Sequence, residues 1–371
     1  MARLSRLSLA AAAALSLGLG MAAPAAVAAP QSAPAAAAQA AKAPEKAKHA
    51  FEFGVIGDVP YGAQQVADFP HMIDELSAQR KDLEFVAHVG DVKAGSAVCS
   101  DEYFQMIRSE FDRLALPLVL TPGDNDWSDC HRANNGAYNP LERLDAFREV
   151  FYPVADRTLG DTSMTLDAQD ELGLPENARF REQRVEFAVL NIQGSSNSTL
   201  PWSGLGLTEQ TPEQIAEVAH RDAANAQLIR DAFADAEKTN ARGVVLLTQA
   251  DMFEPGMVED GVVPATTAAQ YQAFRPTIQL IAELSRESGK PVYLINGDSH
   301  VYTADAPLAA GSPWLDVYGV APVENFQRVT VEGSATSKEW TRFSVAPNSA
   351  GRGAHADQPL LTWERVPYTT F

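Results

Sequence analysis

The chain has 371 residues, of which 46% are hydrophobic and 21% charged, and its formal net charge is −19 at pH 7. This composition is typical of a globular protein, and the large negative charge argues against general affinity for nucleic acids and for anionic membrane surfaces. The same excess of acidic residues is compatible with a cluster of carboxylates that holds cations.

The N-terminal residues predict export. Two arginines in the first six residues precede an apolar run over 7–27, and small residues follow it, which is the layout of a signal peptide over 1–29. A membrane anchor is the alternative, but the run is built mostly from alanine and is broken by Pro24. Residues 30–49, rich in Ala and Pro, read as a disordered linker. The mature chain is therefore expected to be secreted or periplasmic and to have no membrane span.

Apolar runs alternate with helical spacing along the rest of the chain, which indicates a sheet built from βαβ units. We predict strands over 51–57, 84–90, 116–121, 184–191, 243–248 and 291–296, and helices over 66–76, 104–114, 213–238 and 276–285.

The remaining stretches complete a single predicted domain over 50–371. The segment 153–181 is polar and rich in turn residues, and it is interpreted as an insertion or long loop. The runs 326–332 and 340–345 are interpreted as an antiparallel pair of strands. The sequence has no visible internal repeat and no second linker like 30–49.

Five of the predicted strands end in a polar residue that is able to bind a metal. These residues are Asp58, Asp91 in GDVK, Asp124 in PGDND, Gln249 in LTQAD, and Asp298 with His300 in NGDSH. In open α/β sheets, ligands bind beyond the carboxyl ends of the strands, so we expect these side chains to converge. Clustered carboxylates repel each other, and burying them together is costly unless a cation neutralises them.

This ordered set of motifs resembles the calcineurin-like metallophosphoesterase superfamily. That family carries Asp-x-His, Gly-Asp, Gly-Asn-His-Asp/Glu, a lone His and Gly-His-x-His, and the counterparts here are Asp58-Val59-Pro60, Gly90-Asp91, Gly123-Asp124-Asn125-Asp126, Gln249 and Gly297-Asp298-Ser299-His300. The resemblance covers about 51–345 and implies a four-layer α/β/β/α sandwich. It also implies two metal ions, one held by Asp58, Asp91 and His300 and the other by Asp91, Asp124, Gln249 and Asp298.

The departures from the family pattern retune the expected site. Pro60 replaces one His ligand, whereas Asp124, Gln249 and Asp298 replace other ligands and keep a side-chain oxygen. Such donors favour Mg, Mn or Ca over Zn, with Fe as a further candidate. Asn125 stands where the family has a His that contacts the phosphoryl group, so it can donate a hydrogen bond but cannot supply a proton.

The resemblance implies catalytic roles for Asn125, Asp126 and His300. Lys93 has two interpretations of equal weight, a phosphate contact and a balancing charge for the acidic cluster. Tyr61 is interpreted as a turn residue, with filling of the gap beside Pro60 as the alternative. His131 is interpreted as a surface residue, with a substitute general acid as the alternative.

Other polar residues receive structural interpretations. His88 is expected to be a core residue and Trp127 a packing residue or pocket wall. The segment 191–197 is equally compatible with a pocket wall and with a plain loop. Cys99 and Cys130 are predicted to form a disulfide, in preference to two buried thiols, because an exported chain meets an oxidising environment.

The function expected from these features is metal-dependent hydrolysis of a phosphomonoester or phosphodiester, with a small phosphorylated substrate. Because Asn125 replaces a potential acid and general-acid help is worth about 10²–10⁴-fold, the enzyme is expected to be slow or restricted to good leaving groups. The alternative is a weakly active or inactive protein of the same fold that binds cations or a phosphorylated ligand.

Overall fold

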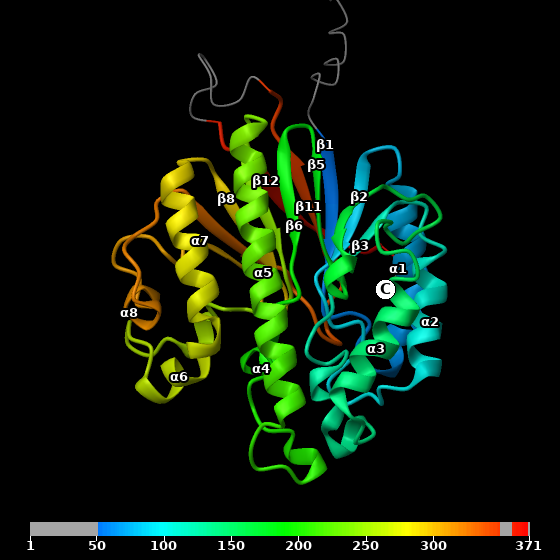
Figure 1. Cartoon of the computed structure of the whole chain (residues 1–371). Coiled ribbons are helices and arrows are strands. Elements are labelled where there is room, and N and C mark those ends of the chain that lie inside the picture. Colours follow the sequence, from blue (N-terminus) through cyan, green and yellow to red (C-terminus); the bar gives the residue numbers. More distant parts are fainter. Residues whose placement is uncertain (1–50, 349–357, 370–371) are drawn as a thin grey trace, which may run out of the picture. The chain divides into compact units, whose positions relative to one another are not determined.

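The computed structural model describes residues 51–348 and 358–369, which belong to one compact unit, 46–371 (Figure 1). The expected signal peptide over 1–29 and linker over 30–49 lie outside the described residues. Within the described residues, no helix combines the length and apolarity needed to cross a membrane.

One sheet has five strands in the order β12-β11-β1-β2-β3. Strands β1 to β3 are parallel to one another, whereas β11 runs antiparallel to β1 and β12 antiparallel to β11. The strand bounds are β1 Phe51–Ile56, β2 Leu83–His88, β3 Leu118–Leu120, β11 Glu339–Val345 and β12 Leu361–Pro367.

The other sheet has seven strands in the order β4-β5-β6-β7-β8-β10-β9. Its four central strands, β6, β7, β8 and β10, are parallel, and the outer strands pair antiparallel. The bounds are β4 Asp167–Gln169, β5 Leu174–Glu182, β6 Val185–Val189, β7 Gly243–Leu247, β8 Val292–Asn296, β9 Thr303–Asp305 and β10 Phe326–Thr330.

Helices cover the outer face of each sheet. The five-stranded sheet packs against α1 Gly62–Ala78, α2 Asp101–Phe111 and α3 Pro140–Phe151. The seven-stranded sheet packs against α5 Pro212–Lys238, α7 Arg275–Ser288 and α8 Trp314–Tyr318. Shorter pieces lie in the connections: α4 Gly194–Asn197, α6 Ala265–Gln270, η1 Ser128–His131, η2 Ala133–Asn135, η3 Asp170–Leu172, η4 Ser203–Leu205, η5 Pro255–Met257 and η6 Tyr271–Phe274.

Local sequence explains where the long helices begin. The side chains of Ser100 and Thr211 accept hydrogen bonds from the backbone N–H groups of Tyr103 and Gln214, which caps the first turns of α2 and α5. Pro212 and Pro276 stand in the first turns of α5 and α7, where a proline costs no helical hydrogen bond.

The inner faces of the two sheets share an apolar core rich in phenylalanine. The Phe53 ring stacks on Phe85 and Phe343 at 4.9 and 5.0 Å between centroids, and it meets the edge of Phe187 from the other sheet at 5.5 Å. The layers therefore run helix, sheet, sheet, helix, which confirms the predicted four-layer α/β/β/α sandwich.

The prediction of an insertion or long loop over 153–181 is wrong in part, because β4 and most of β5 lie in this segment. The polar residues of β5 have partners that other elements supply. Glu176 is buried and pairs with Arg148 of α3 at 2.6 Å, and Arg179 pairs with Asp235 of α5 at 2.5 Å. A strand that is stabilised by ion pairs lacks the apolar alternation that identifies strands in a sequence.

The predicted antiparallel pairing of 326–332 with 340–345 is also wrong. Strand β10 pairs parallel with β8, whereas β11 pairs with β1, so the two segments belong to different sheets. Each strand contributes buried apolar residues to the core between the sheets, and that pattern does not specify a pairing partner.

Replacing Phe187 by alanine tests the importance of the core between the sheets. Because the side chain is fully buried among aromatic rings, we expect Phe187→Ala to lower the free energy of unfolding by about 3–5 kcal/mol. Urea denaturation measures the change. The control Ile215→Ala removes a side chain that is 52% exposed, and it is expected to change stability by less than about 0.5 kcal/mol. Equal losses in the two variants would contradict this packing.

Candidate functional site

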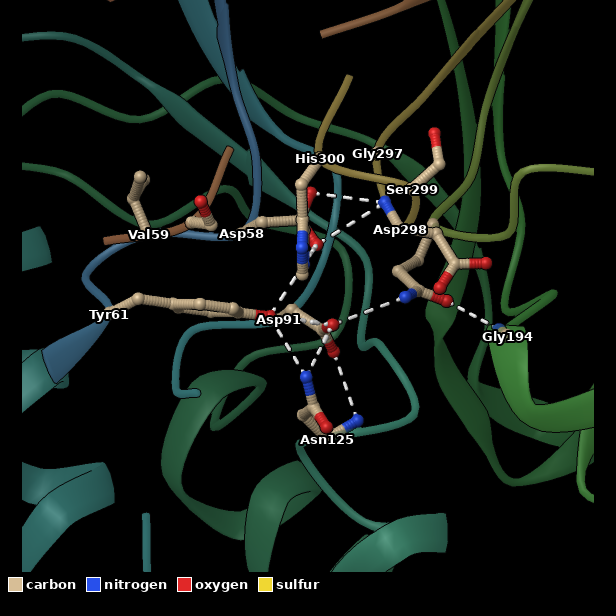
Figure 2. A network of polar contacts seen from close by, with 12 residues as sticks. Asp58, Val59, Tyr61, Asp91, Asn125, Gly194, Gly297, Asp298, Ser299 and His300 are labelled. Carbon is tan, nitrogen blue, oxygen red and sulfur yellow. Dashed lines mark hydrogen bonds and ion pairs between the residues drawn. The ribbon is translucent and has the colours of Figure 1, made fainter. Parts of the chain in front are cut away.

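The five strand ends identified in the sequence do meet at one edge, where the two sheets come together (Figure 2). The backbone N–H of Asp298 donates to both carboxylate oxygens of Asp58, at 3.2 and 3.1 Å. Gln249 Nε2 lies 3.2 Å from both Asp91 Oδ2 and Asp124 Oδ1. Residues that are up to 240 positions apart in the sequence therefore share one hydrogen-bonded cluster.

The backbone turns sharply where these residues leave their strands. Asp58, Asp91 and Asp298 have φ angles of 55°, 60° and 75°, a left-handed conformation that costs L residues on the order of 1–2 kcal/mol each. The preceding Gly90 is needed for close approach, because a Cβ there would lie 2.6 Å from the Gln249 Cβ. A Cβ on Gly123 would likewise collide with Asp91 Oδ1. In this protein the Gly-Asp motifs are therefore packing requirements as well as turns.

Asp91 is the centre of the cluster. Its Oδ2 accepts hydrogen bonds from Tyr61 Oη at 2.9 Å, Asn125 Nδ2 at 2.8 Å and Gln249 Nε2 at 3.2 Å. Its Oδ1 accepts from the backbone N–H of Asn125 at 3.0 Å. Three side-chain donors thus surround Oδ2 of Asp91, the residue that the resemblance predicts to bridge two ions.

Tyr61 points into the cluster, although the sequence favoured a plain turn residue. Its hydroxyl lies 3.5 Å from Asp58 Oδ1 and accepts a hydrogen bond from Asn125 Nδ2 at 2.9 Å. The edge of its ring meets His300, with 5.3 Å between centroids (Figure 2). The phenol therefore stands between Asp58 and Asp91, where the first ion was expected.

His300 lies beside Asp58, with Nε2 at 3.3 Å from Asp58 Oδ1. Burial lowers the pKa of His300, but its interaction with Asp58 outweighs burial and leaves the pKa above its ordinary value. The imidazole is therefore a charge partner for Asp58 in this arrangement.

Asp126 joins two loops of the site. Its carboxylate accepts from the backbone N–H groups of Asp91, Val92 and Gly123, at 3.0, 2.9 and 2.8 Å. Lys93 is fully buried and donates to the carbonyl of Ala94 at 3.1 Å. Burial lowers the pKa of Lys93, and nearby carboxylates, Asp126 first, counter this effect. Its burial favours the balancing-charge interpretation over a phosphate contact.

Asp124 and Asp298 converge on a space that Gly194 leaves open. A Cβ on Gly194 would lie 2.8 Å from Asp124 Oδ2 and 2.6 Å from Asp298 Oδ1. All three residues line a cavity of about 450 Å³, which we call the acidic cavity because Asp251 and Glu254 line it as well.

Sequence reasoning missed Ser195 and Asp129. Ser195 Oγ lies 2.6 Å from Asp124 Oδ2 and 3.0 Å from Asp129 Oδ2, so it links two carboxylates. The sequence of 191–197 is equally compatible with a pocket wall and with a plain loop, and in the structure Ser195 lines the acidic cavity. Asp129 follows the GDND motif in a short 3₁₀ turn, and no pattern in the sequence distinguishes it from a surface acid.

The other candidates lie outside this cluster. His131 Nδ1 accepts from the backbone N–H of Gly204 at 3.1 Å. His88 is buried and bonds the carbonyl of Val59 at 2.9 Å, and Trp127 is buried under the guanidinium of Arg221. Cys99 and Cys130 form the predicted disulfide.

The cluster carries more negative charge than its cations neutralise. Asp58, Asp91, Asp124, Asp126 and Asp129 are buried, against one buried lysine, the half-buried His300 and the partly exposed Arg132, which lies 2.5 Å from Asp129. Burial, followed by repulsion from Asp124, raises the pKa of Asp91 and of Asp298 well above the usual range. Burial also raises the pKa of Asp126 to about 7 and that of Asp129 to about 8. The cluster therefore attracts protons or cations.

The arrangement does not fit the two ions that the resemblance implied. The described residues contain no group of three or more His, Cys, Asp or Glu side chains that could hold a metal ion. Tyr61 and His300 bond the carboxylates of the first position. Gln249 Oε1 accepts from the backbone N–H of Gly194 at 2.5 Å, so its amide N–H groups, and not its oxygen, face Asp91 and Asp124.

The pair Asp124 and Asp298 does fit one hard cation. Their oxygens converge at Gly194 beside an open cavity. Magnesium is commonly bound by one or two carboxylates together with water and substrate phosphates, so a set of three protein ligands is not required.

No protein-family profile and no curated protein matches this chain. Among solved structures, it is similar to GAP50, the anchor in the inner membrane complex of Plasmodium, with a TM-score of 0.45 and 8% identity over 86% of this chain and 85% of that one. It is also similar to purple acid phosphatase PPD1 from yellow lupin seeds, with a TM-score of 0.42 and 11% identity over 80% and 49%. A 5'-nucleotidase precursor from Thermus thermophilus gives a TM-score of 0.38 and 11% identity over 86% and 54%. The chain thus spans about half the length of the latter two.

The raised pKa of Asp129 predicts that stability falls as the pH rises. The folded state holds this proton up to a pKa of about 8, whereas an unfolded aspartate loses it near pH 3.9, so the folded state binds more protons in between. In the presence of a chelator, we expect the free energy of unfolding to decrease between about pH 5 and pH 8. Urea denaturation at a series of pH values measures this slope.

The variant Asp129→Asn isolates the contribution of this carboxyl group, because its side chain does not titrate. In Asp129→Asn we expect the free energy of unfolding to decrease less with rising pH than in the wild type. The control is Asp156→Asn, at an exposed position, which should leave this slope unchanged. A slope in Asp129→Asn as steep as that of the wild type would refute the assignment.

Proposed function

We propose that this chain is a phosphoesterase that depends on one hard divalent cation, Mg²⁺ or Mn²⁺, held between Asp124 and Asp298. The observation that carries the proposal is the convergence of these two carboxylates at Gly194, on the wall of the acidic cavity. The uncompensated negative charge of the cluster supports it, because a cation would replace the protons that this cluster otherwise retains.

Each residue has a distinct role in this proposal. A bound cation would neutralise charge on the phosphoryl group and lower the pKa of a water molecule. Asp124 and Asp298 hold the ion, and the acidic cavity admits the phosphate. Tyr61, Asn125 and Gln249 keep Asp91 in its hydrogen-bonded position.

The enzyme is expected to hydrolyse its substrates slowly. The Asn125 amide already donates to Tyr61 and Asp91, and it has no acidic proton for a leaving group. Without general-acid assistance, worth about 10²–10⁴-fold, aryl esters with good leaving groups are the expected substrates. The disulfide supports the proposal that this activity is exported to the periplasm or the medium.

A second candidate is a protein that binds a cation or a phosphorylated ligand without hydrolysing it. The observation that favours it is the trio of donors around Asp91 Oδ2, because these groups occupy the carboxylate that the family's chemistry would use to bridge two metals.

The substitution Gly194→Ala tests the proposal without changing any charge. Its Cβ would occupy the space between Asp124 and Asp298. We therefore expect the Mg²⁺ concentration that gives half-maximal activity to rise at least tenfold. In Asp298→Asn, turnover of 4-nitrophenyl phosphate should fall at least about 100-fold, because cation-based charge neutralisation is worth several kcal/mol. The assay uses chelator-treated protein with added Mg²⁺, Mn²⁺, Ca²⁺ or Zn²⁺.

The control is Glu259→Gln, which changes an exposed carboxylate that does not line the acidic cavity. It should retain wild-type turnover and cation dependence. Thermal stabilisation by a cation without turnover of any ester would favour the second candidate. If no divalent cation changes either the melting temperature or the turnover, the phosphoesterase proposal fails, and so does the cation-binding form of the second candidate.

A further inference from the structure

A second cavity, of about 530 Å³, lies next to the site and differs from the acidic cavity in character. Its walls combine apolar side chains, including Leu200 and Trp202, with serine hydroxyls. Of the ionisable side chains in its wall, Asp129 and Arg132 contact each other at 2.5 Å, and His131 accepts a hydrogen bond from the backbone N–H of Gly204. We call it the neutral cavity, because it suits an uncharged group, whereas four carboxylates line the acidic cavity.

The two cavities share a wall. Ser195 and Leu200 line both, and Ser195 Oγ lies 2.6 Å from Asp124 Oδ2. Leu200 exposes 55% of its surface, so its side chain offers an apolar contact at this boundary. A ligand with a phosphate near Asp124 is therefore able to extend past Ser195 into the neutral cavity.

Two residues of the neutral cavity carry polar atoms without a partner. Ser198 and Trp202 are each 3% exposed, and neither Ser198 Oγ nor Trp202 Nε1 has a hydrogen-bond partner among the described residues. Buried polar groups in native proteins are nearly always hydrogen-bonded, so each of these two donors is free to bond an acceptor that a ligand in this cavity would carry.

The shared wall has an unusual backbone. Four consecutive residues, Ser195 to Ser198, have φ angles of 47°, 54°, 55° and 62°, a left-handed turn that costs on the order of 1–2 kcal/mol for each residue. Strain of this kind persists only where surrounding contacts over-determine the conformation, and it is concentrated at functional sites.

Side chains from α5 hold the turn in place. Buried Arg221 donates to the carbonyl of Asn197 at 3.0 Å. Gln214 Nε2 donates to the carbonyls of Ser198 and Leu200, at 2.7 and 2.8 Å. The wall is therefore preorganised, which lowers the entropic cost of binding a ligand against it.

We propose that the neutral cavity binds the organic part of the substrate, an uncharged aryl or heteroaryl group with hydrogen-bond acceptors at its edge. The exposed side chain of Leu200 contacts the flat face of this group, and Trp202 Nε1 and Ser198 Oγ donate to its acceptors. The link to phosphate chemistry rests on the proposed function, whereas binding of the organic group does not.

Calorimetric titration with two phosphate-free probes, adenosine and 4-nitrophenol, tests the cavity directly, and glycerol is the non-aromatic comparison. Trp202→Phe keeps an aromatic ring and removes the N–H, so we expect adenosine to bind about 2- to 10-fold more weakly, the effect of one hydrogen bond. Ser203→Trp fills the cavity from an exposed position and should abolish the binding of both probes.

The control Val262→Ala shortens an apolar side chain that is 62% exposed and lines neither cavity, and it should bind the probes like the wild type. Melting temperatures show that each variant is folded. In kinetic assays, Ser203→Trp should raise the KM for 4-nitrophenyl phosphate and leave that for glycerol phosphate unchanged.

The outcomes separate the two proposals. Binding of the aromatic probes that Ser203→Trp removes supports the cavity assignment, whether or not any ester is hydrolysed. Equal binding of the probes to the wild type and to Ser203→Trp overturns the cavity assignment, even if hydrolysis is observed. Absence of hydrolysis alongside intact probe binding counts against the phosphoesterase proposal alone.

Discussion

The mutual repulsion of carboxylates at the meeting edge of two sheets is the constraint on which the rest of this site depends. Burying one unpaired charge costs several kcal/mol, and five aspartates of the cluster are buried. Hydrogen bonds to a charged group return roughly 1.5–3 kcal/mol each, so the donors around Asp91 offset part of this cost. Lys93, His300 and Arg132 offset more, and protons or a cation must supply the remainder.

The fold makes this concentration of charge tolerable. The phenylalanine-rich core between the sheets holds both sets of strands in register, and the strand ends are therefore placed by packing energy that the site itself does not provide. Glycines at 90 and 123 let the backbones approach closely, and Asp126 bonds three backbone N–H groups of the same loops. These glycines and hydrogen bonds hold the loops of the site close together.

The same edge divides into two parts with different chemistry. Tyr61, Asn125 and Gln249 close the side around Asp91 with hydrogen bonds, whereas Gly194 leaves the side around Asp124 and Asp298 open. The left-handed turn that begins at Ser195 separates the acidic cavity from the neutral cavity. In the two proposals, the acidic cavity on one side of Ser195 carries out the chemistry, and the neutral cavity on the other side binds the organic part of the ligand.

The sequence by itself determined which polar residues end the strands, where α1, α2, α5 and α7 lie and which cysteines pair, because these features follow from local periodicity, from turn residues and from having only two cysteines. It did not identify α3. Only the tertiary structure decided the partners. It showed that Tyr61 enters the cluster, that Gln249 presents N–H groups to the carboxylates, and that Ser195 joins Asp124. It also placed β10 and β11 in different sheets and gave the polar strand β5 its ion pairs. The physical reason is that the orientation of an amide and the pairing of a strand depend on contacts with residues far away in the chain, which no local pattern contains.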